Sequence, residues 1–267
     1  MQVFEDFKFN KNFGQNFISD KNLLSAIVSD SGISFACEVL EIGTGAGTLT
    51  EAIAKQAKKV VSYEIDKKLT EYLAEKFENV ENVEVVMADA LKMPIAEIEK
   101  HFKGDYHIIA NLPYYITTPL IFKFLEETNK ARSITIMVQK EVAQKVVAKA
   151  GEENYGILSV MLQYYCDCKI TRIVKKQMFT PRPKVDSAVI RLARKENVQF
   201  DKDFSNFVSK IFAMKRKTLY NNLIQAGFEK NLILQTLQEN NFREDVRAEK
   251  LTLSQIRQLY LSLNKNI

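Results

Sequence analysis

The chain has 267 residues, of which 46% are hydrophobic and 27% are charged, so it can form one large domain or a large and a small one. With only 9 glycines, 5 prolines and no repeat or low-complexity stretch, a collagen-like or disordered chain is excluded. The net charge is +5, but residues 1–165 carry −5 and residues 166–267 carry +10. This asymmetry predicts a polyanion-binding surface built mainly from the C-terminal third.

The few histidines and cysteines exclude several kinds of site. Because His101 and His107 are the only histidines, we expect neither a histidine-based triad nor a metal site. Cys37, Cys166 and Cys168 lack zinc spacing and are typical of reduced thiols in the cytoplasm. The N-terminus has no apolar secretory segment, and the longest apolar stretch, residues 157–162, is too short to cross a bilayer. We therefore expect a cytoplasmic protein with no membrane partner.

Short apolar runs alternate with amphipathic stretches over the first two thirds of the chain. The expected strands are residues 38–42, 60–65, 83–87, 106–110 and 134–138. The expected helices are residues 48–58, 67–77, 95–101, 119–127 and 141–150. Such alternation indicates βαβ units and a doubly wound α/β fold with a parallel sheet. Asp20 is a candidate helix N-cap, and Thr118 followed by Pro119 is typical of a helix start.

The last third of the chain changes pattern. After a helical stretch at 155–165, two strands at 169–174 and 187–193 follow each other without a long helix between them, which predicts an antiparallel edge of the sheet. From Asp201 onward, apolar residues recur every three or four positions, and Thr252 with Gln255 matches a capping box. We therefore expect an α/β domain over residues 1–198 and a small all-α domain over residues 199–267.

Three residue patterns typical of ligand binding occur at successive strand ends. The first strand runs into Gly43-Thr-Gly45-Ala-Gly47, where glycines allow a sharp bend and a close approach to a ligand. Glu64 ends the second strand and can bind both hydroxyls of a ribose, and Asp89 after the third can accept a bond from an adenine amino group. Taken singly, each is also explained by a tight turn or a capping acid. Together they predict a crevice for a nucleoside cofactor, either NAD or S-adenosylmethionine.

The fourth strand ends in Asn111-Leu112-Pro113-Tyr114. The Asn111 side-chain oxygen and a nearby main-chain carbonyl can accept the two N–H bonds of an exocyclic amine, while Tyr114 stacks on the planar base. The alternative is an ordinary proline turn with a buried tyrosine. The pattern thus indicates a base with an amino group as the substrate.

These motifs resemble those of the ribosomal RNA adenine N6-dimethyltransferases over nearly the whole chain. Besides the glycine loop and Asn-Leu-Pro-Tyr, the resemblance is carried by these segments: Asn12-Phe-Gly-Gln-Asn-Phe-Ile18, Asn154-Tyr-Gly-Ile-Leu-Ser-Val160, Phe179-Thr-Pro-Arg-Pro-Lys-Val-Asp-Ser187, Lys215-Arg-Lys-Thr-Leu219 and Arg247-Ala-Glu-Lys-Leu251. Two departures are mild, because Ile18 replaces Leu and Thr44 stands where Pro is usual.

The resemblance implies a Rossmann-like fold that binds S-adenosylmethionine. It implies cofactor contacts at Asn16, Ile18, Gly43, Gly45, Glu64, Asp89 and Asn111. It implies a catalytic group of Asn111, Leu112, Tyr114 and Phe179, although Phe179 could instead be a hydrophobic anchor. The implied reaction is an in-line transfer of a sulfonium methyl to adenine N6. This reaction needs positioning and electrostatic stabilisation rather than a metal or a strong base.

The implied partner is 16S rRNA within the 30S subunit or its precursor, and nothing in the sequence suggests an obligate oligomer, so we expect a monomer. The basic residues expected to contact RNA are Lys175, Lys176, Arg182, Lys184, Lys215, Arg216 and Lys217. The first four belong to a basic run over residues 169–195 that also holds Lys169, Arg172, Arg191, Arg194 and Lys195, from which we expect backbone contacts as well. Any one of these charges could instead belong to a solvated surface.

Three other functions compete with this one. A resistance-type enzyme would modify one adenine of 23S rRNA, but Gly14-Gln15-Asn16 favours the small-subunit group, which modifies two neighbouring adenines near the 3′ end of 16S rRNA. A ribosome-assembly factor without catalysis is disfavoured by the intact Asn111–Tyr114 motif. An NAD-dependent dehydrogenase is disfavoured by the glycine spacing, which differs from that of dinucleotide sites.

Overall fold

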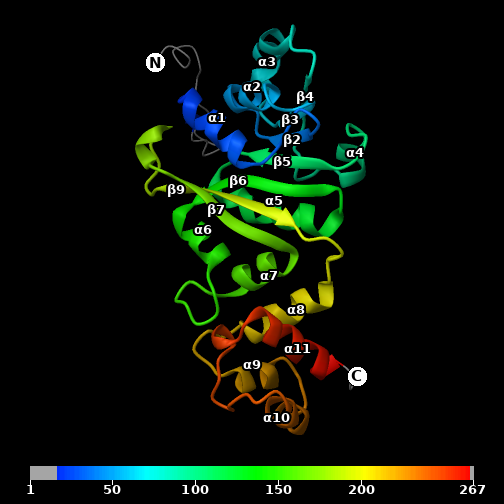
Figure 1. Cartoon of the computed structure of the whole chain (residues 1–267), viewed down its shortest axis with the longest axis vertical. Helices are drawn as coiled ribbons and strands as arrows, with labels where there is room; N and C mark the ends of the chain where they lie inside the picture. Colours follow the sequence, from blue (N-terminus) through cyan, green and yellow to red (C-terminus); the bar gives the residue numbers. More distant parts are fainter. Residues whose placement is uncertain (1–16, 265–267) are drawn as a thin grey trace. The chain divides into compact units, whose positions relative to one another are not determined.

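The strands expected from the alternating pattern form one sheet in the computed structural model, which describes residues 17–264. Its seven strands have the order β4-β3-β2-β5-β6-β9-β7 (Figure 1). They are β2 (Glu38–Ile42), β3 (Lys59–Glu64), β4 (Val83–Met87), β5 (Tyr106–Ala110), β6 (Ala131–Gln139), β7 (Cys166–Val174) and β9 (Ser187–Arg194). Strands β4, β3, β2, β5 and β6 are parallel, whereas β9 runs antiparallel to β6. The doubly wound sheet and its antiparallel edge are therefore confirmed.

Two further strands form a small ribbon outside this sheet. Strand β1 (Phe17–Ile18) pairs antiparallel with β8 (Phe179–Thr180). The ribbon joins the start of the described chain to the loop that precedes β9.

The helices alternate with the strands as expected. They are α1 (Lys21–Asp30), α2 (Thr48–Ala54), α3 (Thr70–Phe77), α4 (Ile95–Glu99), α5 (Tyr114–Glu127), α6 (Lys140–Val147), α7 (Ile157–Tyr165), α8 (Lys202–Ile211), α9 (Leu219–Gln225), α10 (Lys230–Glu239) and α11 (Leu253–Asn264), with short 3-10 turns at Lys67–Leu69, Lys176–Met178 and Ala248–Lys250. The Asp20 carboxylate caps α1 by accepting bonds from the N–H groups of Asn22 and Leu23. No helix within the described range is long and apolar enough to cross a membrane.

The expected helix start at Thr118 is wrong. Helix α5 begins at Tyr114, directly after Pro113, and Pro119 lies inside it. Pro119 is the sixth residue of this helix and has no N–H to donate to the carbonyl of Tyr115, so the helix lacks that bond, whereas Pro113 at the N-cap removes no intrahelical bond. Proline is common at helix starts, and in this protein the helix begins after Pro113 and not at Pro119. As a result, the Asn-Leu-Pro-Tyr motif runs straight into a helix.

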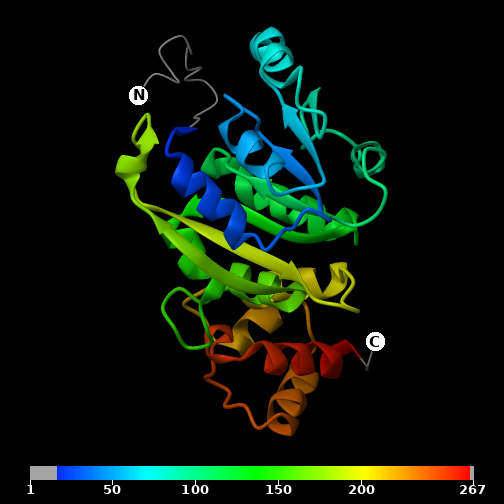
Figure 2. The ribbon, with the colours of Figure 1, turned by 45° about the horizontal axis from the view of Figure 1, so that its top comes forward.

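The core of the sheet lies between helices on its two sides (Figures 1 and 2). Helices α1 and α2 bury Leu24, Ile27, Leu49 and Ile53 against sheet residues such as Val39, and these belong to one hydrophobic cluster. Neighbouring strand residues such as Leu40 are equally buried and point to the opposite face, because side chains alternate along a strand. The sheet is thus buried on both faces, as parallel sheets require.

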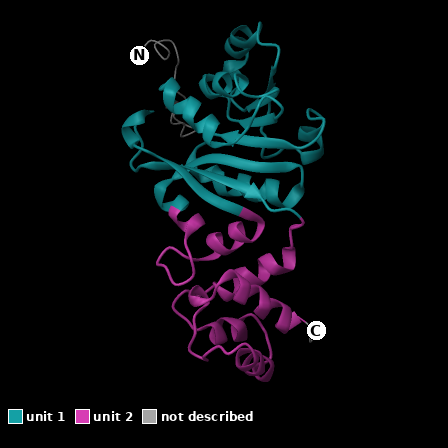
Figure 3. Ribbon diagram, viewed as in Figure 1, with its two compact units in different colours: residues 1–143, 167–196 teal, residues 144–166, 197–267 magenta. Residues whose placement is uncertain are grey.

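The chain divides into two compact units, coloured separately in Figure 3. One consists of residues up to 143 together with 167–196, and the other of 144–166 together with residues from 197 onward. The second unit therefore includes α7, which precedes the last two strands of the sheet. In this unit Phe204 and Phe207 pack edge-on or tilted against Tyr260, and the expected capping box of Thr252 and Gln255 is present.

Candidate active site

The residues singled out at strand ends gather at one edge of the sheet. Gly43, Glu64, Asp89 and Asn111 follow or end β2, β3, β4 and β5, which are adjacent and parallel. Parallel strands have their carboxyl ends at the same edge, and that edge is where open α/β sheets bind ligands.

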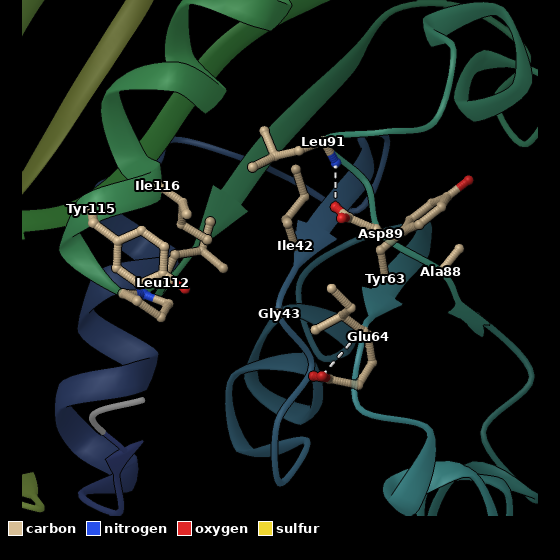
Figure 4. A pocket seen from close by; sticks show the side chains of 12 residues that line it. Ile42, Gly43, Tyr63, Glu64, Ala88, Asp89, Leu91, Leu112, Tyr115 and Ile116 are labelled. Atoms are coloured by element: carbon tan, nitrogen blue, oxygen red, sulfur yellow. Dashed lines mark hydrogen bonds between the residues drawn. The ribbon is translucent and has the colours of Figure 1, made fainter. Parts of the chain in front are cut away.

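A cavity of about 270 Å³ lies at this edge. It is lined by Ile42, Gly43, Tyr63, Glu64, Ile65, Ala88, Asp89, Leu91, Leu112, Pro113, Tyr115 and Ile116. Figure 4 shows the carboxylates of Glu64 and Asp89 on one side of this larger cavity, with Leu112, Tyr115 and Ile116 on the other. An apolar space with a few polar groups at one side is typical of a small-molecule site.

A second cavity of about 50 Å³ shares Gly43, Leu112 and Pro113 with the first. Ile18, the glycine loop and Asn111 line it. Ile18 is buried, and its carbonyl accepts a bond from the Thr48 hydroxyl. The two cavities together bring six of the seven expected cofactor contacts to adjoining spaces, whereas Asn16 lies outside the described residues.

Glu64 is held by three main-chain donors. Its Oε2 atom accepts from the N–H of Gly45 at 2.8 Å, and its Oε1 atom accepts from the N–H groups of Ile65 and Asp66 at 2.9 and 2.8 Å. A carboxylate oxygen has two lone pairs, so Oε1 is fully used and Oε2 keeps one acceptor position. The buried carboxylate is therefore fixed in direction and can still accept one hydroxyl from a ligand.

The glycine loop approaches the Asn-Leu-Pro-Tyr segment closely at Gly43. This residue has φ of +85°, and a Cβ atom there would lie 2.7 Å from Cδ2 of Leu112. Only glycine combines this left-handed backbone with such an approach. Leu112 is thereby packed directly on the loop, between the two cavities.

Asp89 makes a short turn of its own. Its Oδ1 atom accepts from the N–H of Leu91 at 3.0 Å, as Figure 4 shows, and Oδ2 lies 3.6 Å from the Lys92 ammonium. The turn fixes Oδ1 and leaves Oδ2 with acceptor positions at the cavity.

Tyr114 is positioned by a residue that the sequence did not single out. Its hydroxyl lies 2.6 Å from the hydroxyl of Ser187, which is fully buried at the start of β9. Burial raises the pKa of Tyr114, so its hydroxyl stays protonated and can donate in this pair. Ser187 is the last residue of the family-like segment 179–187, but nothing in the neighbouring sequence predicts that it pairs with Tyr114.

Phe179 lies in the hydrophobic core. Only 4% of it is exposed, and it packs in the same cluster as Ile18 and Leu24. Phe179 also pairs with Ile18 in the ribbon of β1 and β8. This arrangement favours the alternative in which Phe179 is a hydrophobic anchor.

Three arginines of the basic run 169–195 have partners within the first unit. Arg172 forms an ion pair with Asp30, Arg191 donates to the carbonyl of Ser31, and Arg194 donates to the carbonyls of Phe124 and Leu125. These guanidinium groups therefore also stabilise the protein itself.

The other expected RNA contacts differ in exposure. Lys175 pairs with Asp186 at 3.1 Å. The main-chain N–H of Lys176 donates to the same carboxylate, and this bond together with the Lys175 ammonium lowers the pKa of Asp186. Arg182 and Lys184 are exposed. Lys215, Arg216 and Lys217 are also exposed, but they lie in the connection between α8 and α9 and not on a helix.

Sequence reasoning also missed Tyr115 and a buried hydrogen-bond network of Glu41, Thr44, Thr50 and Ser62 beneath the glycine loop. Tyr115 is 69% exposed at the larger cavity, although large apolar side chains are usually covered. Within residues 17–264 no group of three or more His, Cys, Asp or Glu side chains could hold a metal ion.

Comparisons with known proteins agree with this geometry. Residues 6–265 match the family model described as ribosomal RNA adenine dimethylase. "Ribosomal RNA small subunit methyltransferase A" of Clostridioides difficile (strain 630) is 41% identical, over 98% of this chain and 93% of that protein. The protein of the same name from Lysinibacillus sphaericus (strain C3-41) is also 41% identical, over 95% and 90%.

Two solved structures are similar over nearly the whole chain. A dimethyladenosine transferase from Plasmodium falciparum has a TM-score of 0.80 and 27% identity, covering 93% of this chain and 98% of its own. The 23S rRNA methyltransferase ErmE has a TM-score of 0.74 and 26% identity, covering 93% and 100%. With the family model matched almost from end to end, the chain belongs to the ribosomal RNA adenine dimethylase family.

Proposed function

We propose that this protein uses S-adenosylmethionine to dimethylate N6 of two adjacent adenines near the 3′ end of 16S rRNA, in the 30S subunit or its precursor. The observation that carries the proposal is the convergence of Glu64, Asp89 and Asn111 on adjoining cavities at one sheet edge. The protein would act in the cytoplasm as a monomer and take part in small-subunit biogenesis.

The donor groups at the cavity suit the cofactor. Glu64 Oε2 keeps one acceptor position for a ribose hydroxyl, and Asp89 Oδ2 faces the same space with capacity for an amino group. Ile18, Gly43 and Gly45 would complete the site from the smaller cavity, with Asn16 before them. When bound, the cofactor supplies an electrophilic methyl group on sulfur.

The chain's own residues orient the accepting nitrogen. The Asn111 side-chain oxygen and the Leu112 carbonyl accept the two N–H bonds of the adenine amino group, which frees the nitrogen lone pair from the ring. The same oxygens stabilise the positive charge that develops on nitrogen. Tyr114, fixed by Ser187, offers its ring to the base. Phe179 lies in the core and would anchor the loop that precedes β9, the strand that carries Ser187.

An Asn111→Ala variant tests the reaction. We expect turnover to be nearly abolished while S-adenosylmethionine still binds measurably, because the variant removes an acceptor for the substrate and leaves Glu64 and Asp89 intact. Asn129→Ala, at an exposed residue that contacts Arg194, is the matched control and should retain activity. Full activity of Asn111→Ala would contradict the assignment.

The small subunit is favoured as the substrate by the relatives. Proteins that are 41% identical carry the small-subunit name, whereas the 23S enzyme is 26% identical. The test is labelled methyl transfer to unmethylated 30S and to 50S subunits, followed by mapping of the modified adenines. We expect two adjacent dimethylated adenines in 16S rRNA. Incorporation into 50S alone would favour the resistance-type enzyme, and none in either would favour a non-catalytic assembly factor.

Backbone contacts to RNA would come from Lys175, Lys176, Arg182 and Lys184, and from the exposed segment 215–217. Reversing the charges of Lys215 and Lys217 should weaken RNA binding and reduce its salt dependence, because fewer counterions are released. Reversal of Lys55 and Lys58, which are also exposed, changes the net charge equally and is the control. Equal effects of the two double variants would remove residues 215–217 from the interface.

A further inference from the structure

A buried hydrogen-bond network lies beneath the glycine loop and has no part in the reaction described above. It consists of Glu41 on β2, Thr44 in the loop, Thr50 on α2 and Ser62 on β3. Glu41, Thr50 and Ser62 are fully buried, and Thr44 is 4% exposed. Four polar side chains from four segments thus meet in the protein interior.

The network has a defined direction. The hydroxyls of Thr50 and Ser62 each donate to Glu41 Oε2 at 2.6 Å, and the hydroxyls of Thr44 and Ser62 are also 2.6 Å apart. Because a serine hydroxyl has one proton and Ser62 gives it to Glu41, Thr44 must be the donor to Ser62. Glu41 is therefore the acceptor at the end of a chain that starts on the loop.

Glu41 is held in an environment that is costly for a carboxyl group. Burial raises the pKa of Glu41 to about 8, opposed by the bonds from Ser62 and Thr50 and reinforced by the charge of Glu64. Its Oε1 atom is buried without a hydrogen-bond partner among the described residues. An apolar side chain of similar size would avoid this cost, so filling space does not by itself explain a carboxyl group at this position.

The loop is attached to β3 at successive points. The N–H of Gly43 donates to the carbonyl of Tyr63 at 2.8 Å, and the N–H of Gly45 donates to Glu64. The Thr44–Ser62 bond lies between these two and joins a side chain of the loop to a side chain of β3. Ser62 and Glu64 are two residues apart on β3, so they share a face of the strand.

We propose that Glu41 is a positioning residue for the cofactor, acting through Ser62 and Thr44 to hold the loop Gly43–Gly47 against β3. The inference rests on the proposed use of S-adenosylmethionine at this site. Thr44 replaces the proline that is usual in the resembling family, and proline has no hydroxyl, so this link belongs to the present chain.

Two isosteric variants separate positioning from simple stabilisation. Thr44→Val and Thr50→Val each remove one hydroxyl from the same network, but only Thr44 is on the loop. We expect Thr44→Val to weaken the binding of S-adenosylmethionine, measured by calorimetry, by about threefold to tenfold. The KM for the cofactor should rise by the same factor with kcat nearly unchanged. Thr50→Val should lower thermal stability and leave both cofactor constants unchanged.

Two further variants complete the test. Thr44→Ser keeps the hydroxyl and should restore wild-type binding, and Ser62→Ala interrupts the chain in the middle and should match Thr44→Val. Equal cofactor affinity in Thr44→Val and wild type, or equal losses in Thr44→Val and Thr50→Val, would overturn the inference. If the wild-type protein itself binds no S-adenosylmethionine, the proposed function fails and the inference with it.

Discussion

Replacing Gly43 with alanine should disturb both stability and the site, by two mechanisms that a second glycine can separate. Gly43 has φ of +85°, and an alanine Cβ would meet Leu112 Cδ2 at 2.7 Å. Gly151 has a nearly identical φ of +88°, but a Cβ there would meet nothing within 4 Å. Both substitutions place an L-residue in the left-handed region, and only one adds a steric conflict.

The magnitudes follow from these two contributions. The left-handed backbone costs an L-residue about 1–2 kcal/mol, which is all that Gly151→Ala should lose in free energy of unfolding. Overpacking a buried site adds about 1–3 kcal/mol, so Gly43→Ala should lose roughly 2–5 kcal/mol. The Leu112 side chain must shift to make room, and because it lines both cavities, the shape of the site changes with it.

Urea denaturation followed by circular dichroism measures the stability loss, and calorimetry with S-adenosylmethionine measures the site. We expect Gly43→Ala to be the less stable variant and to bind the cofactor more weakly, whereas Gly151→Ala binds it as wild type does. Equal losses of stability in the two variants, with unchanged cofactor binding in both, would refute the argument from the close approach of Gly43 and Leu112.

Three other predictions follow from single contacts. Burial raises the pKa of Glu41 from 4.5 to about 8, so the stability that its protonated form provides is complete below pH 4.5 and is lost as the pH rises to 8. Over this range the free energy of unfolding should fall more steeply with pH in wild type than in Glu41→Gln, by up to about 1.4 kcal/mol per pH unit. Equal pH dependence of the two proteins in urea denaturation would contradict this prediction. Tyr114→Phe and Ser187→Ala each break the same 2.6 Å bond, so each should lower kcat on RNA about twofold to tenfold without changing cofactor affinity. The double variant should be no worse than either single variant, and additive losses in single-turnover assays would show that the two residues act separately. Asp20→Ala should cost about 1 kcal/mol in urea denaturation because α1 loses its cap, whereas Asp20→Asn should be close to wild type; two equally stable variants would argue against the cap.

The sheet and most of its helices could be predicted because their hydrophobic periodicity is strong and local. Strands β2, β4 and β5 have the expected ends, and the strand-end positions of Glu64 and Asp89 follow from that pattern. The start of α5 was predicted wrongly, because Thr118 followed by Pro119 gives a helix-start signal inside a helix that begins earlier, directly after Pro113.

The supporting contacts of the site depend on tertiary structure and have no local signal. The partner of Tyr114 is Ser187, from a strand far along the chain, and the two partners of Glu41, Thr50 and Ser62, come from α2 and β3. Likewise, the basic run predicted RNA contacts at Arg191 and Arg194 but gave no sign that Arg191 donates to the carbonyl of Ser31 after α1, or that Arg194 donates to carbonyls of α5. Residue type and spacing predict which groups bind a ligand, but not which groups hold them in place.

The ribbon of β1 and β8 has a consequence for local unfolding. Its two strands are two residues long and pair with each other, so β1 cannot separate from β8 without leaving both strands of the ribbon unpaired. A short, separate pair of strands opens at a much lower free energy than the seven-stranded sheet. The amides of this pair should therefore exchange with solvent at a common rate, faster than those of β5. One opening event would then expose both a wall of the smaller cavity and the anchor of the loop before β9.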